Sequence, residues 1–452
     1  MRILLVFIFS FAAYFSFGQA TVSKVDTLTK KKEIIGYFFN LHYDHFNKKN
    51  LLTPFNADFS KYTIINYFYM SPDEFGNIIH HEYLRINDYN LPDIDEILLG
   101  GVIDDQYTYN VNYPVYVPYI NMVDHCHRVG TKIVLSIGEK TPHIFPKVAA
   151  DPAKRAHFAA ECKRVCKRWN LDGIDILNWV NPTNTSSVNS SNTDNFDLLL
   201  QTVRDSLTSL EKEINRHYLL TGAFSGDKKV LSLINWKSVN KQLDYINLFS
   251  INSVQSVSTF SLHNSPLYPY QCSSPGASIH ESLSKLTSIL GIPREKIIMG
   301  ISFNGSTTTG FPDRNVNLCE HHSNQPDYET FATGSNENTA AYIVEQGAPS
   351  YSRILKAMQQ FERKWDNDAK VPYLTGKRVN TLCSYDDLLS VQIKAEYVIK
   401  EKLAGCLITN INSDWVENPL IPGEILDTPL IDAINEIFFI KNDFVRNNTY
   451  IR

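Results

Sequence analysis

The stretch DGIDILNWVNP, residues 172–182, decides the fold prediction. Its first half is a short apolar run broken by one acid, Asp175, which is typical of a strand buried in a parallel sheet. A proline and a polar, asparagine-rich segment follow, as expected where a strand passes into a loop. The stretch therefore predicts the end of an inner strand. After Asp175 it contains no further acid.

Similar apolar runs recur along the chain and alternate with longer amphipathic stretches. Strands are predicted at residues 33–39, 62–69, 132–137, 171–176, 218–224, 245–251, 296–303 and 405–410. This alternation indicates repeated strand–helix units around a parallel sheet, and eight such runs predict an α/β fold, a closed (β/α)8 TIM barrel. Among the helices, Asp151 and Pro152 predict an N-cap and a first helical position, and residues 193–214 have apolar side chains at helical spacing.

Two segments interrupt this repeat. Residues 181–195, NPTNTSSVNSSNTDN, are too polar to pack and predict a surface loop. Residues 305–385 are too long for one strand–helix connection and contain a predicted helix at 351–365, YSRILKAMQQFERKW. We therefore expect a small α+β insertion at 305–385, between strands seven and eight, with the barrel formed by residues 19–304 and 386–452.

The N-terminus has the pattern of a signal peptide. Arg2 precedes an apolar stretch, residues 3–17, and the small residues Ser16 and Gly18 occupy the positions that a signal peptidase reads. Residues 1–18 are therefore predicted to direct export to a periplasmic, cell-surface or extracellular location. The stretch is shorter than the roughly 20 residues of a membrane span and no similar stretch recurs, so no membrane span is expected. A formal charge of -5 with 43% hydrophobic residues argues against a nucleic-acid partner.

The cysteines and histidines predict neither a metal nor a cofactor. Seven cysteines are an odd number, so at least one thiol stays free or pairs with another chain. Cys162 and Cys166 would share one helix face, but no second pair at ligand spacing accompanies them, and we interpret them as small buried hydrophobic side chains. His321 and His322 form the densest histidine cluster, without an HExxH pattern.

Six motifs in order carry a family resemblance. They are IIGYFFN, KIVLSIGEK, LDGIDI, YINLFSIN, GIPREKIIMGISFNG, and VPYL followed by SYDDLLSVQIKAEYVIKEKLAGCLITN. Together they resemble glycoside hydrolase family 18, the chitinases and endo-β-N-acetylglucosaminidases. In that family the third strand ends in SxGG, the fourth contains DGxDxDxE, and the sixth ends in MxYD. The resemblance covers nearly the whole chain after the signal peptide and implies the same barrel fold.

The resemblance also implies a chemistry and a ligand, a glycan containing N-acetylglucosamine. In the family a Glu protonates the glycosidic oxygen while the 2-acetamido group of the substrate attacks the anomeric carbon. An Asp two residues earlier steers that group, a Tyr and an Asp on strand six hold it, and a Trp on strand eight forms the floor of the pocket. Because residues two apart in a strand face the same side, DxDxE points three carboxylates into the lumen.

The present sequence departs from the family at the reactive positions. Asp172 and Asp175 match the first two acids, and we interpret Asp175 as a hydrogen-bonded buried acid and Asp172 as the entry to strand four. Counting straight on, Leu177 replaces the steering Asp and Trp179 the acid Glu. A one-residue bulge would instead bring Asn178 and Val180 to these two positions. The degenerate catalytic positions are thus Asp172, Asp175, Leu177, Asn178, Trp179 and Val180.

Other family positions differ as well. Ile251 and Asn252 replace the Tyr and Asp of strand six, Thr409 replaces the Trp of strand eight, and Glu139 replaces the second glycine of SxGG. We therefore predict no catalytic residue. An active chitinase or endo-β-N-acetylglucosaminidase would need a relocated carboxylate, Glu139 or Asp175, and a misplaced acid loses most of its contribution to the rate.

Two other functions compete with hydrolysis. A glycan-binding protein would stack sugars on aromatic rings near the strand ends, namely Tyr37, Phe38, Tyr67, Tyr69, Trp179 and Phe249, and burial of half of these rings would weaken it. The ligand-binding candidates are Tyr37, Tyr69, Glu139, Trp179, Asn252 and Thr409. A scaffold for an envelope or extracellular protein would instead fill the pocket with Leu177, Val180 and Ile251 and expose an apolar patch elsewhere.

Overall fold

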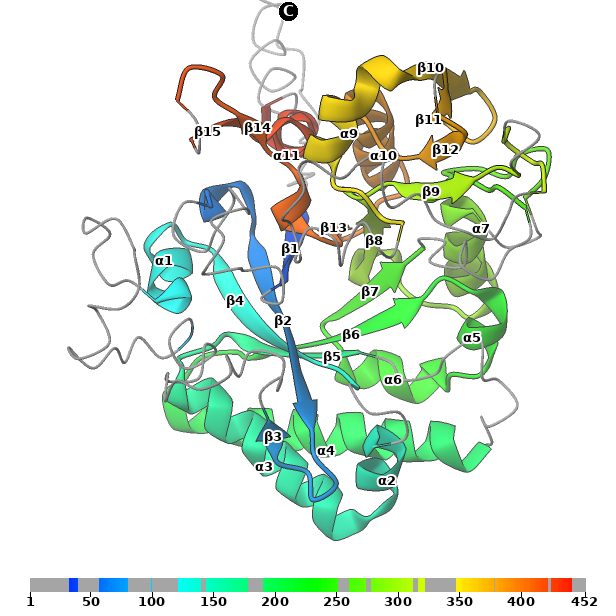
Figure 1. Ribbon diagram of the computed structural model, residues 1–452. Helices are drawn as coiled ribbons and strands as arrows, with labels where there is room; N and C mark the ends of the chain where they lie inside the picture. Colours follow the sequence, from blue (N-terminus) through cyan, green and yellow to red (C-terminus); the bar gives the residue numbers. More distant parts are fainter. Residues whose placement is uncertain are drawn as a thin grey trace, which may run out of the picture. The chain divides into compact units, whose positions relative to one another are not determined.

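The structure of the chain is a computed structural model (Figure 1). It describes residues 32–39, 57–79, 99, 121–139, 144–177, 190–250, 260–273, 278–311, 316–321, 347–377, 379–421 and 424–440. All of these residues belong to one compact unit, Lys32–Arg452.

A closed barrel of parallel strands forms the centre of this unit. Its strands are β1 (Glu33–Phe39), β2 (Ile64–Pro72), β4 (Lys132–Ile137), β5 (Gly173–Leu177), β6 (Leu219–Ser225), β7 (Tyr245–Phe249), β8 (Ile297–Ile301) and β13 (Gly405–Ile408). They follow the order β1-β13-β8-β7-β6-β5-β4-β2, and β1 also pairs with β2, which closes the ring. The chain therefore folds as the predicted (β/α)8 TIM barrel, and each of the eight predicted strands overlaps one barrel strand.

Helices cover the outside of the barrel. They are α1 (Met122–Arg128), α2 (Ile144–Ala150), α3 (Pro152–Arg168), α4 (Ser190–Ile214), α5 (Lys228–Ser232), α6 (Trp236–Gln242), α7 (Ile279–Ser284), α10 (Leu388–Lys400) and α11 (Pro429–Asn435). Asp151 caps α3 as predicted, because its Oδ1 accepts from the amides of Ala153 and Lys154. The predicted loop at 181–195 was partly wrong, since α4 already begins at Ser190.

Short elements complete the barrel. β3 (Ile78–Ile79) pairs antiparallel with the end of β2. 3-10 turns occur at Phe59–Lys61, Arg294–Lys296 and Ile411–Ser413, and π-helical turns at Lys285–Ile289 and Glu436–Ile440 continue α7 and α11. After β13, β14 (Val416–Glu417) and β15 (Ile425–Asp427) form a separate two-stranded sheet.

The insertion between barrel strands β8 and β13 has its own antiparallel sheet. It contains β9 (Ser306–Thr309), α9 (Tyr351–Ala357), a 3-10 turn at Met358–Gln360, β10 (Phe361–Asp366), β11 (Val371–Gly376) and β12 (Thr381–Ser384), with strand order β10-β11-β12-β9. The predicted helix at 351–365 was wrong in its second half. Residues from Phe361 onward have ordinary helical propensity, but pairing with β11 draws them into a strand.

The loop between β7 and α7 is fastened to this insertion. The Cys272–Cys319 disulfide joins them, and buried His263 lies 3.1 Å from both Ser384 Oγ and Asp366 Oδ2. The other five cysteines are buried and free, including Cys162 and Cys166. Their predicted role as small buried hydrophobic side chains is confirmed.

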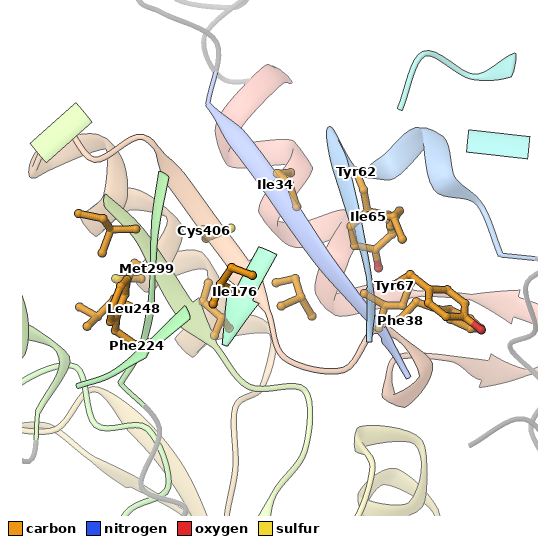
Figure 2. Close-up of a cluster of buried hydrophobic side chains, with 14 of the residues drawn as sticks. Ile34, Phe38, Tyr62, Ile65, Tyr67, Ile176, Phe224, Leu248, Met299 and Cys406 are labelled. Atoms are coloured by element: carbon orange, nitrogen blue, oxygen red, sulfur yellow. The ribbon is translucent and has the colours of Figure 1, made fainter. Parts of the chain in front are cut away.

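The main hydrophobic core lies between the strands and the helices. Figure 2 shows part of it, with Ile34 and Phe38 of β1 and Ile65 and Tyr67 of β2 on the outer side of the barrel wall. Phe38 and Tyr67 are both fully buried and stack with ring centroids 6.4 Å apart. A second, smaller cluster fills the lumen. Because side chains alternate along each strand, the residues between those of the outer core point into the lumen, where the candidate site lies.

Candidate functional site in the barrel lumen

The floor of the lumen is organised around Asp175 of β5, which is fully buried. Its Oδ2 accepts from Tyr37 Oη and Ser136 Oγ, each at 2.9 Å. Its Oδ1 accepts from Thr221 Oγ1 at 2.5 Å and from Asn247 Nδ2 at 3.1 Å. Four strands other than β5 thus donate to one carboxylate, and both of its oxygens are committed.

Burial shifts the pKa values of the titratable groups in this floor. It raises the pKa of the Asp175 carboxyl above its ordinary value, while the four donated hydrogen bonds act in the opposite direction. Burial also raises the pKa of Tyr37, and the neighbouring carboxylate adds to that shift. Tyr37 therefore stays a neutral donor to Asp175, and its Oη accepts in turn from Asn247 Nδ2 at 2.9 Å.

Strand β5 can lie close beside strand β6 because residue 173 is glycine. A Cβ atom on Gly173 would lie only 2.2 Å from the Leu219 carbonyl oxygen. Ahead of it, at the amino end of β5, Asp172 Oδ2 accepts from the Ile133 amide at 2.8 Å and lies 2.8 Å from His127 Nε2. Asp172 therefore joins neighbouring elements at the opposite end of the strand from the lumen mouth, as expected for a residue that sets the entry to this strand.

Apolar side chains gather at the mouth of the lumen, above Asp175. Leu177 follows Asp175 on the same face of β5 and is half-buried in the lumen cluster, together with Phe39, Phe68 and Phe249. The Phe39 and Phe68 ring centroids are 4.3 Å apart, and the Tyr37 ring contacts Phe249 edge-on at 5.2 Å. Aliphatic and aromatic side chains thus lie directly above the polar floor.

Leu177 itself occupies space next to the third barrel strand. A Cβ atom on Gly138 would lie 2.5 Å from Leu177 Cδ1 and 3.0 Å from the Tyr69 ring. Leu177 and half-buried Tyr69 therefore pack over the glycine that follows β4. The position at which the family resemblance places a steering carboxylate holds a packed isobutyl group.

Glu139, the alternative carboxylate at the rim, stabilises a helix. Its Oε1 accepts from the Phe145 backbone amide at 2.7 Å, in the first turn of α2. A carboxylate at a helix N-terminus satisfies an otherwise unpaired amide and interacts favourably with the helix dipole. The Glu139 side chain thus takes part in holding the start of α2.

The aromatic candidates divide into buried and half-buried rings. Tyr37, Phe38 and Tyr67 are fully buried, Tyr37 in the lumen and the other two in the outer core. Tyr69 and Phe249 are half-buried. Half of the six predicted rings are thus closed to a sugar, and this burial weakens the hypothesis that the protein binds glycans by stacking. Thr409 follows β13, is half-buried, and donates its backbone amide to the Ile301 carbonyl at 3.2 Å.

Several predicted positions lie outside the described residues. These are Asn178, Trp179 and Val180 after β5, and Ile251 and Asn252 after β7. His322 also lies outside them. Within the described ranges no three histidine, cysteine or acidic side chains are grouped so that they could hold a metal ion.

The sequence analysis missed three partners of Asp175, namely Ser136, Thr221 and Asn247. Each lies on a predicted strand, and counting inward-facing residues in steps of two from the strand ends was the signal that could have found them. The register between neighbouring strands decides which of these side chains reach Asp175. The pattern of a single sequence does not reveal that register.

The fold is a (β/α)8 barrel with a buried, hydrogen-bonded carboxylate in its lumen, and comparisons with known proteins identify its family. The family model for glycosyl hydrolases family 18 matches residues 33–414, and the chain belongs to that family. Chitinase A1 of Niallia circulans is 26% identical over 306 residues, which are 63% of this chain and 40% of that protein. The match thus spans less than half of that relative's length.

Solved structures show the same fold. The immunomodulatory active chitinase from Trichuris suis superposes with a TM-score of 0.71 at 23% identity, covering 90% of this chain and 100% of that one. YKL-39, solved in the presence of chitooligosaccharides, gives a TM-score of 0.69 at 19% identity, with 90% and 99% covered. In the part of this chain that the structure describes, no helix combines the length and apolarity needed to cross a membrane.

Proposed function

We propose that this chain is a family 18 barrel that binds glycans containing N-acetylglucosamine without hydrolysing them. One observation carries the proposal: the two carboxylates considered for catalysis, Asp175 and Glu139, are both engaged in structural hydrogen bonds. Asp175 accepts four hydrogen bonds below the mouth, and Leu177 stands where a steering acid is needed. Glu139 caps α2. General acid catalysis requires a protonated group within hydrogen-bond reach of the leaving oxygen, and neither carboxylate is available for that role.

We further propose that the protein is exported. The pattern of residues 1–18 favours a signal peptide, and the Cys272–Cys319 disulfide favours an oxidising compartment. The location would be periplasmic, cell-surface or extracellular. We assign residues 305–385 to an inserted subdomain, supported by the separate sheet of β9 to β12.

Binding and turnover should be measured together on purified protein. We expect chitohexaose to bind, with no shorter oligomer released over a long incubation. Release of shorter oligomers that is abolished by Glu139→Gln or Asp175→Asn would instead establish an active enzyme with a relocated carboxylate. Absence of binding to chitohexaose and to N-glycans would contradict the glycan-binding proposal.

A protein-interaction scaffold is the second candidate function. It is favoured by the burial of Tyr37, Phe38 and Tyr67, which removes three rings from any sugar-binding surface, and by the apolar packing at the lumen mouth. Such a scaffold requires an exposed apolar surface elsewhere on the molecule.

A further inference from the structure

The hairpin formed by β14 and β15 has unpaired edges. Val416 and Glu417 pair with Asp427 and Ile425, and next to this pairing the Asn418 amide donates to the Glu424 carbonyl at 2.8 Å. This sheet has two strands only, and neither pairs with another strand in the described ranges. Figure 1 shows the hairpin in orange, beside α11. Unpaired edges offer backbone groups to an incoming strand.

Large apolar side chains are concentrated on this hairpin. Leu420 is 87% exposed, Leu426 60% and Ile421 54%. Single exposed apolar residues are common on protein surfaces, but a cluster on one short hairpin is typical of an interaction site. The barrel does not bury these side chains, since most of their surface faces solvent.

A groove adjoins the hairpin on the side of α9. Its volume is about 470 Å³, and its lining includes Leu355 of α9 together with Val416 and Pro419. Trp415, largely buried, forms one wall, and Lys356 Nζ lies 5.0 Å from the centre of its ring. Such a volume accommodates one or two side chains of a bound segment.

The charged side chains around the hairpin indicate the charge of a partner that would fit it. Glu417, Glu424 and Asp427 are acidic, and among the described residues an ion pair joins Glu417 to Lys356, with Nζ at 3.2 Å. A second copy of the chain would bring acidic groups against acidic groups, which disfavours self-association. A segment with basic residues complements the surface.

We propose that this hairpin docks an extended apolar segment of a basic partner protein. The segment adds a strand to the β14–β15 sheet, covers Leu420 and Leu426, and inserts a side chain into the groove. This inference deepens the scaffold candidate of the proposed function, and it stands whether or not the lumen binds a glycan.

The test uses the full chain and a defined peptide. A fluorescent ten-residue peptide of alternating lysine and valine should bind, and a peptide with glutamate in place of lysine should not. We expect Leu420→Ser/Leu426→Ser, and separately Glu417→Gln/Glu424→Gln, to weaken binding at least tenfold. Leu388→Ser/Leu389→Ser is the matched control, because these leucines are 45% and 48% exposed on α10, and it should bind as the wild type does.

Three results would overturn the inference. They are failure of the lysine–valine peptide to bind the wild type, equal binding by the Leu420→Ser/Leu426→Ser variant, and a concentration-dependent dimer in sedimentation that this variant abolishes. The last would identify a second copy as the occupant. Chitohexaose binding measured on the same variants separates the two proposals, because it should be unchanged by all of them.

Discussion

The lumen changes its chemical character within two residues of β5. At Asp175 five strands converge on one carboxylate, whereas at Leu177 the neighbours are Phe68, Phe249 and Tyr69. The floor is an interlocked polar network in which each group needs its partners. The mouth consists of half-buried apolar side chains, for which shape matters more than the identity of any one side chain. The floor therefore serves the stability of the barrel.

Removing the floor carboxylate should have the largest effect. Asp175→Ala leaves buried donors on Tyr37, Ser136, Thr221 and Asn247 without an acceptor, so we expect the free energy of unfolding to fall by about 3 kcal/mol or more. Denaturant unfolding measures it, with Asp175→Asn as a milder control that keeps one acceptor oxygen. Wild-type stability in the alanine variant would show that the network does not hold the barrel together.

Asp414 offers a second buried carboxylate against which to compare the floor. It follows β13, and its oxygens accept from the Leu430 and Ile431 amides at the start of α11. Burial raises its pKa to about 7, and the two amides oppose the shift. Because the folded state holds the proton more tightly, this group contributes most stability at pH values below about 4, and the contribution is lost as the pH rises through 7.

The corresponding measurement is the unfolding free energy between pH 4 and pH 7. We expect this group to lower it by roughly 1 kcal/mol per pH unit in the wild type, and Asp414→Asn to remove that slope. An unchanged slope in the variant would mean that Asp414 is already ionised throughout this range.

Two neighbouring residues of β5 allow the packing of the outer core to be compared with the packing of the mouth. Ile176 faces the outer core and is fully buried, while Leu177 is half-buried at the mouth. We expect Ile176→Ala to cost about 3 kcal/mol and Leu177→Ala about 1 kcal/mol, since a cavity at the mouth can relax or admit water. Equal losses in thermal unfolding would mean that the mouth is packed as tightly as the core.

The smallest effect is expected at the rim. Glu139→Gln keeps an oxygen for the Phe145 amide but removes the charge, so stability should fall by less than about 1 kcal/mol. Chitohexaose binding should be unaffected. A large loss of binding would place Glu139 in contact with the glycan.

The sequence predicted the barrel because its strands are short apolar runs that alternate with amphipathic stretches, a pattern that can be read locally. It predicted that Asp175 is buried and hydrogen-bonded, since an acid inside such a run must be satisfied. It did not predict the role of Glu139, because capping depends on where α2 begins relative to β4. The strand at Phe361 was also missed, since its partner β11 determines it and local propensity does not.

The Cys272–Cys319 disulfide has a mechanical consequence. Its two cysteines are 47 residues apart, and barrel strand β8 lies within the covalent ring that they close. A chain pulled from its two ends would extend about 160 Å less than its full contour length, because the residues inside the ring cannot be stretched until a reductant opens it. One wall strand of the barrel is thus shielded from tension along the chain.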